Sequence, residues 1–383
     1  MGESNGTVTA SFWDLQASGQ TTSAGGTGKT TVEMQTIETF LDVGWDFVDE
    51  SGNGTSQVWR MPQGGGYPVL AIFDGYTPPE LQGLGTPEAP YLISNALELG
   101  AIVYHSPSAH YRLTASIDLS GIHWGTAVIP YFAGTFDGNH HEISHLTVDG
   151  GAFLGVFGRL VSGAEVTDLE LEEVSITGSA GYIGGLAGFS DGFLMGGGGL
   201  ITRCSSTGTV RGSGSWEAVG GLVGSSWSTD VIQCYSTGSV LGGSSVGGLV
   251  GGHIGGTLSN CYSTATVRGA TPVGGLLGEN RGGTVMQCYS AGAVTRGGGL
   301  VGENNTTIAA SFWDLQTSGQ TASAGGIGKT TAEMRTASTF LEAAWDFVDE
   351  TANGTDGIWW IDEGKDYPRL WWELQEPEET PEQ

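Results

Sequence analysis

Basic residues are scarce in this 383-residue chain, which has 13 lysines and arginines against 41 aspartates and glutamates and a formal net charge of −28. Nucleic acids and anionic membrane surfaces are bound through basic patches, so this charge balance argues against both classes of partner. No stretch approaches the ~18 consecutive apolar residues of a membrane-spanning helix. We therefore expect neither nucleic-acid binding nor membrane insertion.

A secretory signal is also missing, because residues 1–5 have neither a basic start nor an apolar run. Residues 2–7 instead match residues 302–307, as if the chain began inside a longer repeat. We therefore expect a fragment of a larger protein, without its signal peptide.

Glycine, in contrast, is abundant at 68 of 383 residues, but it has no Gly-X-Y period, which excludes a collagen helix. A short sequence motif, Gly-Gly-Leu-hydrophobic-Gly, which we call the glycine word, instead occurs five times. Its leucines are 24 to 36 residues apart, at Leu186, Leu222, Leu249, Leu276 and Leu300. A repeat of this length is typical of a solenoid rather than a compact domain.

A second word, Cys-Tyr-Ser or a close variant, begins at Cys204, Cys234, Cys261 and Cys288. The segments around both words are short, rich in β-branched and aromatic residues and bounded by Gly, Ser and Asn, which favours strands. We predict an all-β fold, a right-handed parallel β-helix with short helical caps, whose stacked coils bury one continuous core. In that core the four cysteines form an inward column of free thiols, because their side chains point in parallel.

A longer repeat has an offset of 300 residues: Ser11–Gln16 recurs as Ser311–Gln316, and Trp45–Glu50 as Trp345–Glu350. It suggests a tandem array of modules. The parts that we expect are the C-terminal cap of an upstream module at 1–75, a proline-punctuated linker at 76–90, the β-helix at 91–310, a second copy of the cap at 311–375 and an acidic linker tail at 376–383.

Two helices are predicted at the ends of the β-helix. The first runs from Ser94, as N-cap, to Ile102, with Leu97, Leu99 and Ile102 turned inward. The second opens at a Thr-x-x-Glu capping box at 330–333 and continues to about residue 344.

The cap also contains predicted strands. Ser311-Phe312-Trp313 occupies the Cys-Tyr-Ser position of the last coil, and residues 359–360 and 370–372 are predicted as terminal strands.

These words resemble those of the GLUG-motif repeat proteins, named for the Gly-Leu-x-Gly core of the first word. The segments at 113–121 and 134–139 and the Ser-Phe-Trp-Asp tail also look like that family. The resemblance implies a large bacterial repeat protein, extracellular or attached to the cell surface. Such chains occur among adhesin-like and hemagglutinin-like proteins and beside the catalytic part of IgA-specific metallopeptidases. It assigns no catalytic residue to the repeats.

We interpret the chain as a non-catalytic module that acts as a stiff structural or adhesive element. One alternative is a self-assembling extracellular filament, in which residues 7–16 of one copy dock near residues 300–312 of another and the coils continue head-to-tail. The other is a carbohydrate-binding or polysaccharide-degrading β-helix. The expected partners are thus neighbouring modules, further copies of the chain, or a surface polysaccharide.

The regular repeat is interrupted between residues 189 and 227. Phe189, Trp216 and Trp227 lie there, and aromatic side chains on an extended surface can stack on sugar rings, so these three are candidate ligand contacts. A loop folded over the flank of the solenoid is the alternative interpretation.

Two patterns concern metal ions. His141-Glu142-Ile143-Ser144-His145 matches the zinc peptidase signature, but that chemistry requires a helix, and this segment is predicted as a strand. A zinc peptidase is therefore not expected, although a weak metal site at His141 and His145 stays open.

The second pattern occurs twice, as Asp49-x-Ser51-x-Asn53-Gly54 and as Asp349-x-Thr351-x-Asn353-Gly354. It resembles the opening of a calcium loop but lacks the glutamate at position twelve. Asp49, Asn53, Asp349 and Asn353 are candidates for a weak calcium site, with a polar turn as the alternative. No other cofactor is expected.

Overall fold

A computed structural model of the chain describes residues 7–18, 20–48, 50, 52–54, 57–62, 66–71, 79–161, 163–192, 198–214 and 217–374. Inter-residue contacts divide the chain into two compact units, Met1–Pro78 and Pro79–Gln383. No helix in the described ranges is long and apolar enough to cross a membrane.

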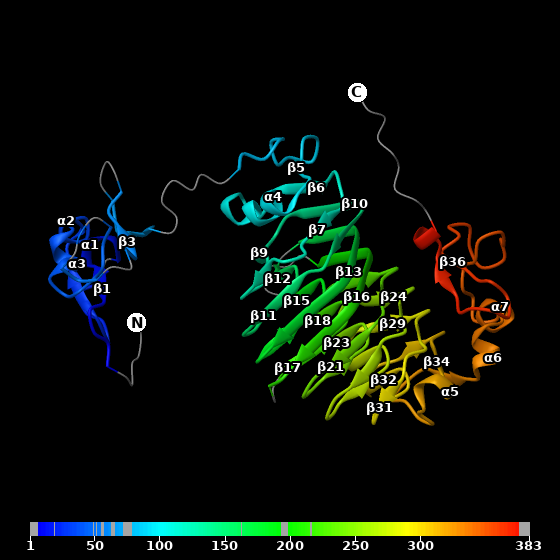
Figure 1. Cartoon of the computed structure of the whole chain (residues 1–383). Coiled ribbons are helices and arrows are strands. Elements are labelled where there is room, and N and C mark those ends of the chain that lie inside the picture. Colours follow the sequence, from blue (N-terminus) through cyan, green and yellow to red (C-terminus); the bar gives the residue numbers. More distant parts are fainter. Residues whose placement is uncertain are drawn as a thin grey trace. The chain divides into compact units, whose positions relative to one another are not determined.

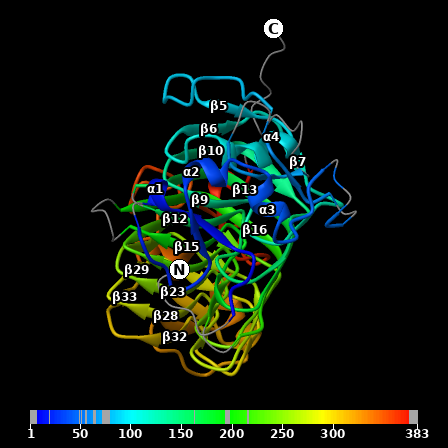
Figure 2. The same cartoon turned by 90° about the vertical axis from the view of Figure 1, so that its left-hand side faces the viewer.

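The second unit is a parallel β-helix, which confirms the predicted fold class (Figures 1 and 2). In the described residues its coils are joined into three sheets. The long sheet has twenty strands: β5 (Tyr91–Ile93), β6 (His110–Leu113), β7 (Ile117–Asp118), β8 (His123–Trp124), β10 (Thr135–Ser144), β11 (Thr147–Gly150), β13 (Glu165–Gly178), β16 (Gly199–Gly212), β19 (Thr229–Ile232), β20 (Tyr235–Ser236), β21 (Ser239–Leu241), β24 (Thr257–Ser259), β25 (Tyr262–Ser263), β26 (Thr266–Arg268), β29 (Thr284–Met286), β30 (Tyr289–Ser290), β31 (Val294–Thr295), β33 (Ile308–Ala309), β34 (Phe312–Asp314) and β35 (Ile327–Lys329).

The other two sheets are shorter. The seven-stranded sheet contains β9 (Ile129–Phe132), β12 (Phe157–Val161), β15 (Ala187–Asp191), β18 (Val223–Trp227), β23 (Val250–Ile254), β28 (Leu277–Arg281) and β32 (Val301–Asn304). The four-stranded sheet contains β14 (Gly181–Ile183), β17 (Glu217–Gly220), β22 (Val246–Gly247) and β27 (Val273–Gly274).

Each coil stacks on the next in register, so equivalent residues form columns along the solenoid. Val223 pairs with Val250, which pairs with Leu277 and then Val301. The leucine of each glycine word is fully buried. One continuous core thus runs through the coils, as expected for a solenoid.

The Cys-Tyr-Ser word alternates between the two sides of its strand. The four cysteines are free and fully buried, as predicted, and the serines of β20, β25 and β30 also point inward. The tyrosines between them point outward and form a column of Tyr235, Tyr262 and Tyr289. Their rings stack with centroids 5.0 and 4.9 Å apart.

Residues 81–105 cover the first coil. Leu81 is buried, and Gln82 forms an isolated antiparallel β-bridge with Leu92. The packed chain therefore begins within the stretch 76–90 predicted as a linker. Helix α4 (Ala96–Ala101) is followed by a 3-10 turn (Ile102–Tyr104).

The helix α4 differs from its prediction in two ways. Asn95 is the N-cap instead of Ser94, and its side chain accepts a hydrogen bond from the Glu98 amide. The Glu98 carboxylate in turn accepts hydrogen bonds from the amide and the hydroxyl of Ser94. Leu99 is buried, but Leu97 is 59% exposed. Two residues along a helix is a rotation of about 200°, so Leu97 must point away from the face that Leu99 buries.

The C-terminal cap, residues 311–374, follows the last coil. It contains β34, α5 (Leu315–Ser318), β35, α6 (Thr331–Met334), α7 (Ala337–Leu341), β36 (Trp359–Trp360), β37 (Arg369–Leu370) and a 3-10 turn (Trp371–Leu374). Phe312 pairs with Tyr289, which confirms the position predicted for the Ser-Phe-Trp word. The Thr330–Glu333 capping box is present.

The helix predicted from this capping box to about residue 344 is instead two short helices. The backbone leaves the helical path at Thr336, which has an extended conformation. This break lets Met334 and Phe340 both enter the cap's core, where they are fully buried. Residues 370–372 are likewise only partly strand, because a 3-10 turn begins at Trp371.

The cap folds back across the tyrosine column. Trp359 Nε1 donates to Asn260 Oδ1 at 3.0 Å, and Trp372 Nε1 donates to the Gln233 carbonyl at 3.0 Å. The hydroxyls of Tyr262 and Tyr289 donate to Glu373 Oε2 (2.9 Å) and the Pro368 carbonyl (2.6 Å). A second buried cluster, formed by cap aromatics and the column, therefore lies outside the solenoid core.

The first unit has the same element order as the cap. It contains β1 (Phe12–Asp14), α1 (Leu15–Ser18), β2 (Thr27–Lys29), α2 (Thr31–Met34), α3 (Glu38–Leu41), β3 (Trp59–Arg60) and β4 (Val69–Leu70). Strand β1 pairs in parallel with β2, and β3 pairs antiparallel with β4.

Truncating a core leucine tests the solenoid. We expect Leu249→Ala to lower the free energy of unfolding by about 2–5 kcal/mol, because it leaves a cavity between coils that stack in register. The exposed Leu97→Ala is the control and is expected to change it by less than about 0.5 kcal/mol. Urea denaturation measures both, and equal effects would contradict the assigned core.

The Glu373 carboxyl makes the stability of the cap depend on pH. Burial raises the pKa of its carboxyl to about 7, and Glu170 adds to the rise. The folded chain therefore keeps this proton between about pH 4.5 and 7, where the unfolded chain loses it, so cap stability falls as pH rises through that window. We expect the cap to unfold at lower urea concentration at about pH 8 than at about pH 5. Glu373→Gln should remove this difference, and an unchanged pH dependence would contradict the assignment.

Candidate functional site

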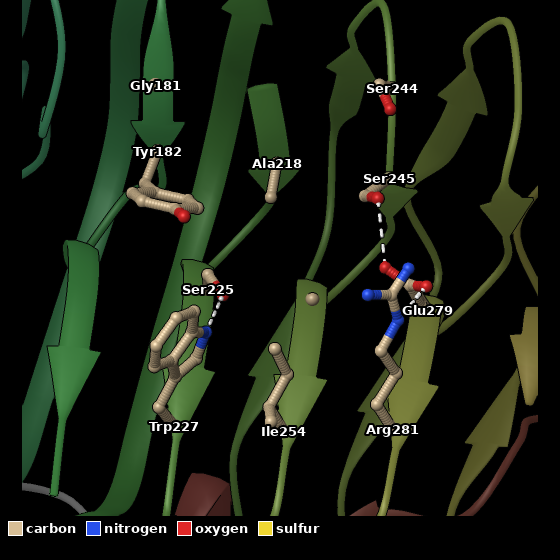
Figure 3. A pocket seen from close by; sticks show the side chains of 11 residues that line it. Gly181, Tyr182, Ala218, Ser225, Trp227, Ser244, Ser245, Ile254, Glu279 and Arg281 are labelled. Carbon is tan, nitrogen blue, oxygen red and sulfur yellow. Dashed lines mark hydrogen bonds and ion pairs between the residues drawn. The ribbon is translucent and has the colours of Figure 1, made fainter. Parts of the chain in front are cut away.

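A groove of about 430 Å³ crosses several coils on the flank of the β-helix (Figure 3). It lies where the four-stranded sheet meets the seven-stranded sheet. Its lining side chains are Tyr182, Ala218, Ser225, Trp227, Ser244, Ser245, Ile254, Glu279 and Arg281, with Gly181 and Gly252.

One end of the groove is aromatic. The rings of Tyr182 and Phe189 stack with centroids 4.9 Å apart, and Trp227 meets Phe189 edge-on at 5.3 Å. The Arg159 guanidinium lies over the rings of Phe153 and Phe189, at 4.6 and 5.4 Å. The cluster holds the two half-buried rings, Tyr182 and Trp227, in place at the groove.

The other end is polar. The Arg281 guanidinium forms an ion pair with Glu279, and the Ser245 hydroxyl donates to the same carboxylate at 3.5 Å. The Arg281 side chain is 60% exposed, whereas that of Glu279 is 12% exposed. The groove therefore presents a cation and hydroxyls to solvent beside a largely covered anion.

Small residues make the floor. The register places Ser225 beside Gly252, and Gly252 beside Glu279, on three successive strands. The three atoms nearest to a Cβ atom at Gly252 would all belong to side chains, the closest being Ser225 Oγ at 3.2 Å. The absent side chain at Gly252 thus keeps the groove open between its aromatic and polar ends.

The three predicted ligand contacts have different positions. Trp227 lines the groove, and its Nε1 donates to Ser225 Oγ at 3.1 Å. Phe189 is only 3% exposed, so the expectation that it is a surface contact is wrong: it packs behind Tyr182 and Trp227. Trp216 lies outside the described residues.

Sequence reasoning missed Tyr182, Glu279 and Arg281. A signal for the last two exists, because strand residues alternate between the core and the outer face. The third and fifth residues after each Gly-Leu-x-Gly leucine form outward columns, and Trp227, Ile254 and Arg281 are equivalent in the second of these. Aligning the repeats on their leucines would have shown that these positions vary while their neighbours stay small or buried.

Residues 141–144 of the His-Glu-x-x-His segment lie on strand β10, as predicted, but His145 follows the end of the strand and has a left-handed φ of 57°. His145 is held between two carboxylates, with Nδ1 2.9 Å from Asp118 Oδ1 and Nε2 3.2 Å from Glu173 Oε2. Burial lowers the pKa of His141, which lies at the opposite end of the motif. Within the described ranges, no group of three or more His, Cys, Asp or Glu side chains is placed to hold a metal ion.

The calcium-loop candidates that the structure describes, Asn53, Asp349 and Asn353, lie in turns or bends. The Asn53 side-chain amide donates to the Leu41 carbonyl at 2.7 Å, and Asn353 donates to the Leu341 carbonyl at 2.9 Å. Asp349 is exposed and has a left-handed φ of 66°. Asp49 lies outside the described residues. Both asparagines therefore serve to close their turns.

A serine–histidine pair also occurs, but it is inside the solenoid. Ser226 Oγ and His253 Nδ1 are 2.7 Å apart, and both residues are fully buried. Burial lowers the pKa of His253 to about 4, so the ring is neutral near pH 7. A polymeric substrate cannot reach this pair without opening the coils.

The fold defines a repeat protein, a parallel β-helix with a groove on its flank. Residues 179–211, 217–241 and 242–268 match the family model of the GLUG motif, so these coils are GLUG repeats. The resemblance predicted from the glycine words is confirmed for this stretch.

Two known proteins are similar to parts of the chain. Halomucin of Haloquadratum walsbyi (strain DSM 16790 / HBSQ001) is 36% identical over 156 residues, which span 37% of this chain and 2% of halomucin. A solved structure from Bacteroides ovatus, provisionally assigned as an immunoglobulin A1 protease, has a TM-score of 0.54 at 21% identity and covers 76% of this chain and 94% of its own. At that identity the likeness shows a shared fold.

Two substitutions separate the turn from the calcium interpretation. We expect Asn353→Ala to lower the stability of the cap by about 1–3 kcal/mol, because the Leu341 carbonyl loses its donor. Asp349→Asn keeps a residue that tolerates left-handed φ while removing the carboxylate, and should be neutral. Thermal unfolding with and without calcium is the measurement. Stabilisation of the unaltered chain by calcium that Asp349→Asn abolishes would contradict the turn interpretation.

Proposed function

We propose that the chain is a non-catalytic module of a large cell-surface repeat protein, where it acts as a stiff structural and adhesive element. The observation that carries this proposal is the unbroken parallel pairing of the coils from Tyr91 to Phe312. Main-chain hydrogen bonds fix each coil to the next, so the module resists bending and presents its flanks in a constant arrangement. The similarity to halomucin over a small part of that protein supports a place within a long surface protein.

The adhesive part of the proposal rests on the groove. Half-buried rings of Tyr182 and Trp227 offer apolar faces, and Ser244, Ser245 and Arg281 offer hydrogen-bonding groups nearby. A pyranose ring has the same mixed character, with apolar C–H faces and a rim of hydroxyls. We therefore favour a carbohydrate chain as the ligand.

Charge narrows the class of carbohydrate. The net charge of −28 repels polyanions at long range, and the Arg281 guanidinium is paired with Glu279. Neutral or amino-sugar polymers are therefore favoured over acidic polysaccharides.

The proposal is tested by binding to a panel of neutral, amino-sugar and acidic polysaccharides. We expect binding without shortening of the polymer, and a loss of about tenfold or more in affinity for Trp227→Ala and for Gly252→Leu, which fills the floor. Gly125→Leu is the matched control, because a Cβ atom there meets no atom within 4 Å and lies outside the groove lining. Equal affinities for all three variants would contradict a groove site, and a shortened polymer would contradict the non-catalytic assignment.

A further inference from the structure

The first unit and the C-terminal cap are built by the same contacts. Trp45 Nε1 donates to the Ala10 carbonyl at 2.8 Å, as Trp345 Nε1 does to the Ala310 carbonyl at 2.8 Å. The Tyr67 hydroxyl likewise donates to Asp14 as Tyr367 does to Asp314, both at 2.7 Å. The first unit is thus a second copy of the cap in structure as well as in sequence.

The cap shows what this fold binds. Its strand β34 pairs on one side with β35 and on the other with β30 of the last tyrosine coil. Trp345, Trp359 and Leu370 are fully buried, with Trp345 and Trp359 about 6 Å from the ring of Tyr289. A backbone edge and an aromatic face are therefore used together to cover the tyrosine column.

In the first unit the same edge and face are uncovered. Strand β1 pairs only with β2 in the part of the chain that the structure describes. Leu70 is 37% exposed where Leu370 is fully buried, and Trp45 and Trp59 are half-buried where their counterparts are covered completely. We call this surface, made of β1, Trp45, Trp59 and Leu70, the vacant cap face.

We propose that the vacant cap face docks on the tyrosine column of a second copy of this chain, in place of that copy's own cap. The interface already exists within the chain, and the residues that make it are the same types in both copies: phenylalanine at 12 and 312, tryptophan at 45 and 345 and at 59 and 359, and leucine at 70 and 370. Exchange of such an equivalent element between chains requires no new contact surface.

This contact differs from the end-on stacking expected from the sequence alone. Within the stretch 300–312, expected to receive the next copy, Phe312 already pairs with Ile327 of the cap's own strand β35, and the Val301 carbonyl accepts from the Ala324 amide of the cap. Each chain's own cap is covalently linked to its tyrosine column and therefore has a high effective concentration there. The form in which a chain's own cap covers its column thus dominates until that cap is weakened. Assembly therefore depends on which of two nearly equivalent caps covers the tyrosine column: the chain's own cap or the first unit of another copy.

The experiment uncovers the tyrosine column in the full chain and measures the weight-average mass in solution. The double variant Trp345→Ala/Trp359→Ala removes the cap's rings from the column, and sedimentation velocity should show at least a doubling of the weight-average mass as concentration rises. The matched variant Trp45→Ala/Trp59→Ala should remain monomeric. With all four tryptophans replaced, the chain should also remain monomeric, since neither partner face is then intact.

Two results would overturn the proposal. One is a cap double variant that stays monomeric although hydrogen exchange shows that the Tyr289–Ser290 strand has lost its cover. The other is equal assembly of the fourfold variant, which would mean non-specific association of the bare column. Hydrogen exchange adds a positive readout, because the amides of Phe12–Asp14 should gain protection in the assembled cap variant and not in the monomers.

Discussion

Parallel backbone pairing between successive coils is the interaction on which the rest of this protein depends. The pairing places equivalent residues in columns, so a repeated word becomes a continuous layer: leucine and cysteine inside, tyrosine outside. A solenoid of this kind gains its core from contacts between neighbours, and each coil is stable only because the next one covers it. The open ends therefore need other elements, which residues 81–105 and the cap provide.

Departures from the repeat carry the specific features. The groove exists because Gly252 stands in a column that elsewhere contains Phe189, Ser225 and Glu279. The lateral cluster exists because cap aromatics cover the tyrosines instead of leaving them in water. One regular scaffold thus presents two different surfaces, a polar and aromatic groove and a column that binds a cap.

Several parts of this structure could be predicted from the sequence because they are local or repeated. The spacing of Leu249 and its equivalents defines the coils, and the Thr330–Glu333 pair defines a helix start. Other parts depend on residues far apart in the chain. The partner of Asn260 is Trp359, and the two ends of the groove, Tyr182 and Arg281, come from different coils. No short-range pattern reports such pairings, although alignment of the repeats would have placed Arg281 on the outer face with Trp227.

We infer that the coils form one continuous, cooperative scaffold. Hydrogen exchange of the intact chain, resolved along the sequence, tests it most directly. We expect strand amides from β6 to β30 to exchange together and slowly, because each is bonded to a neighbouring coil. Slow segments separated by coils that exchange rapidly would contradict a continuous scaffold, and with it the stiffness on which the proposed function rests.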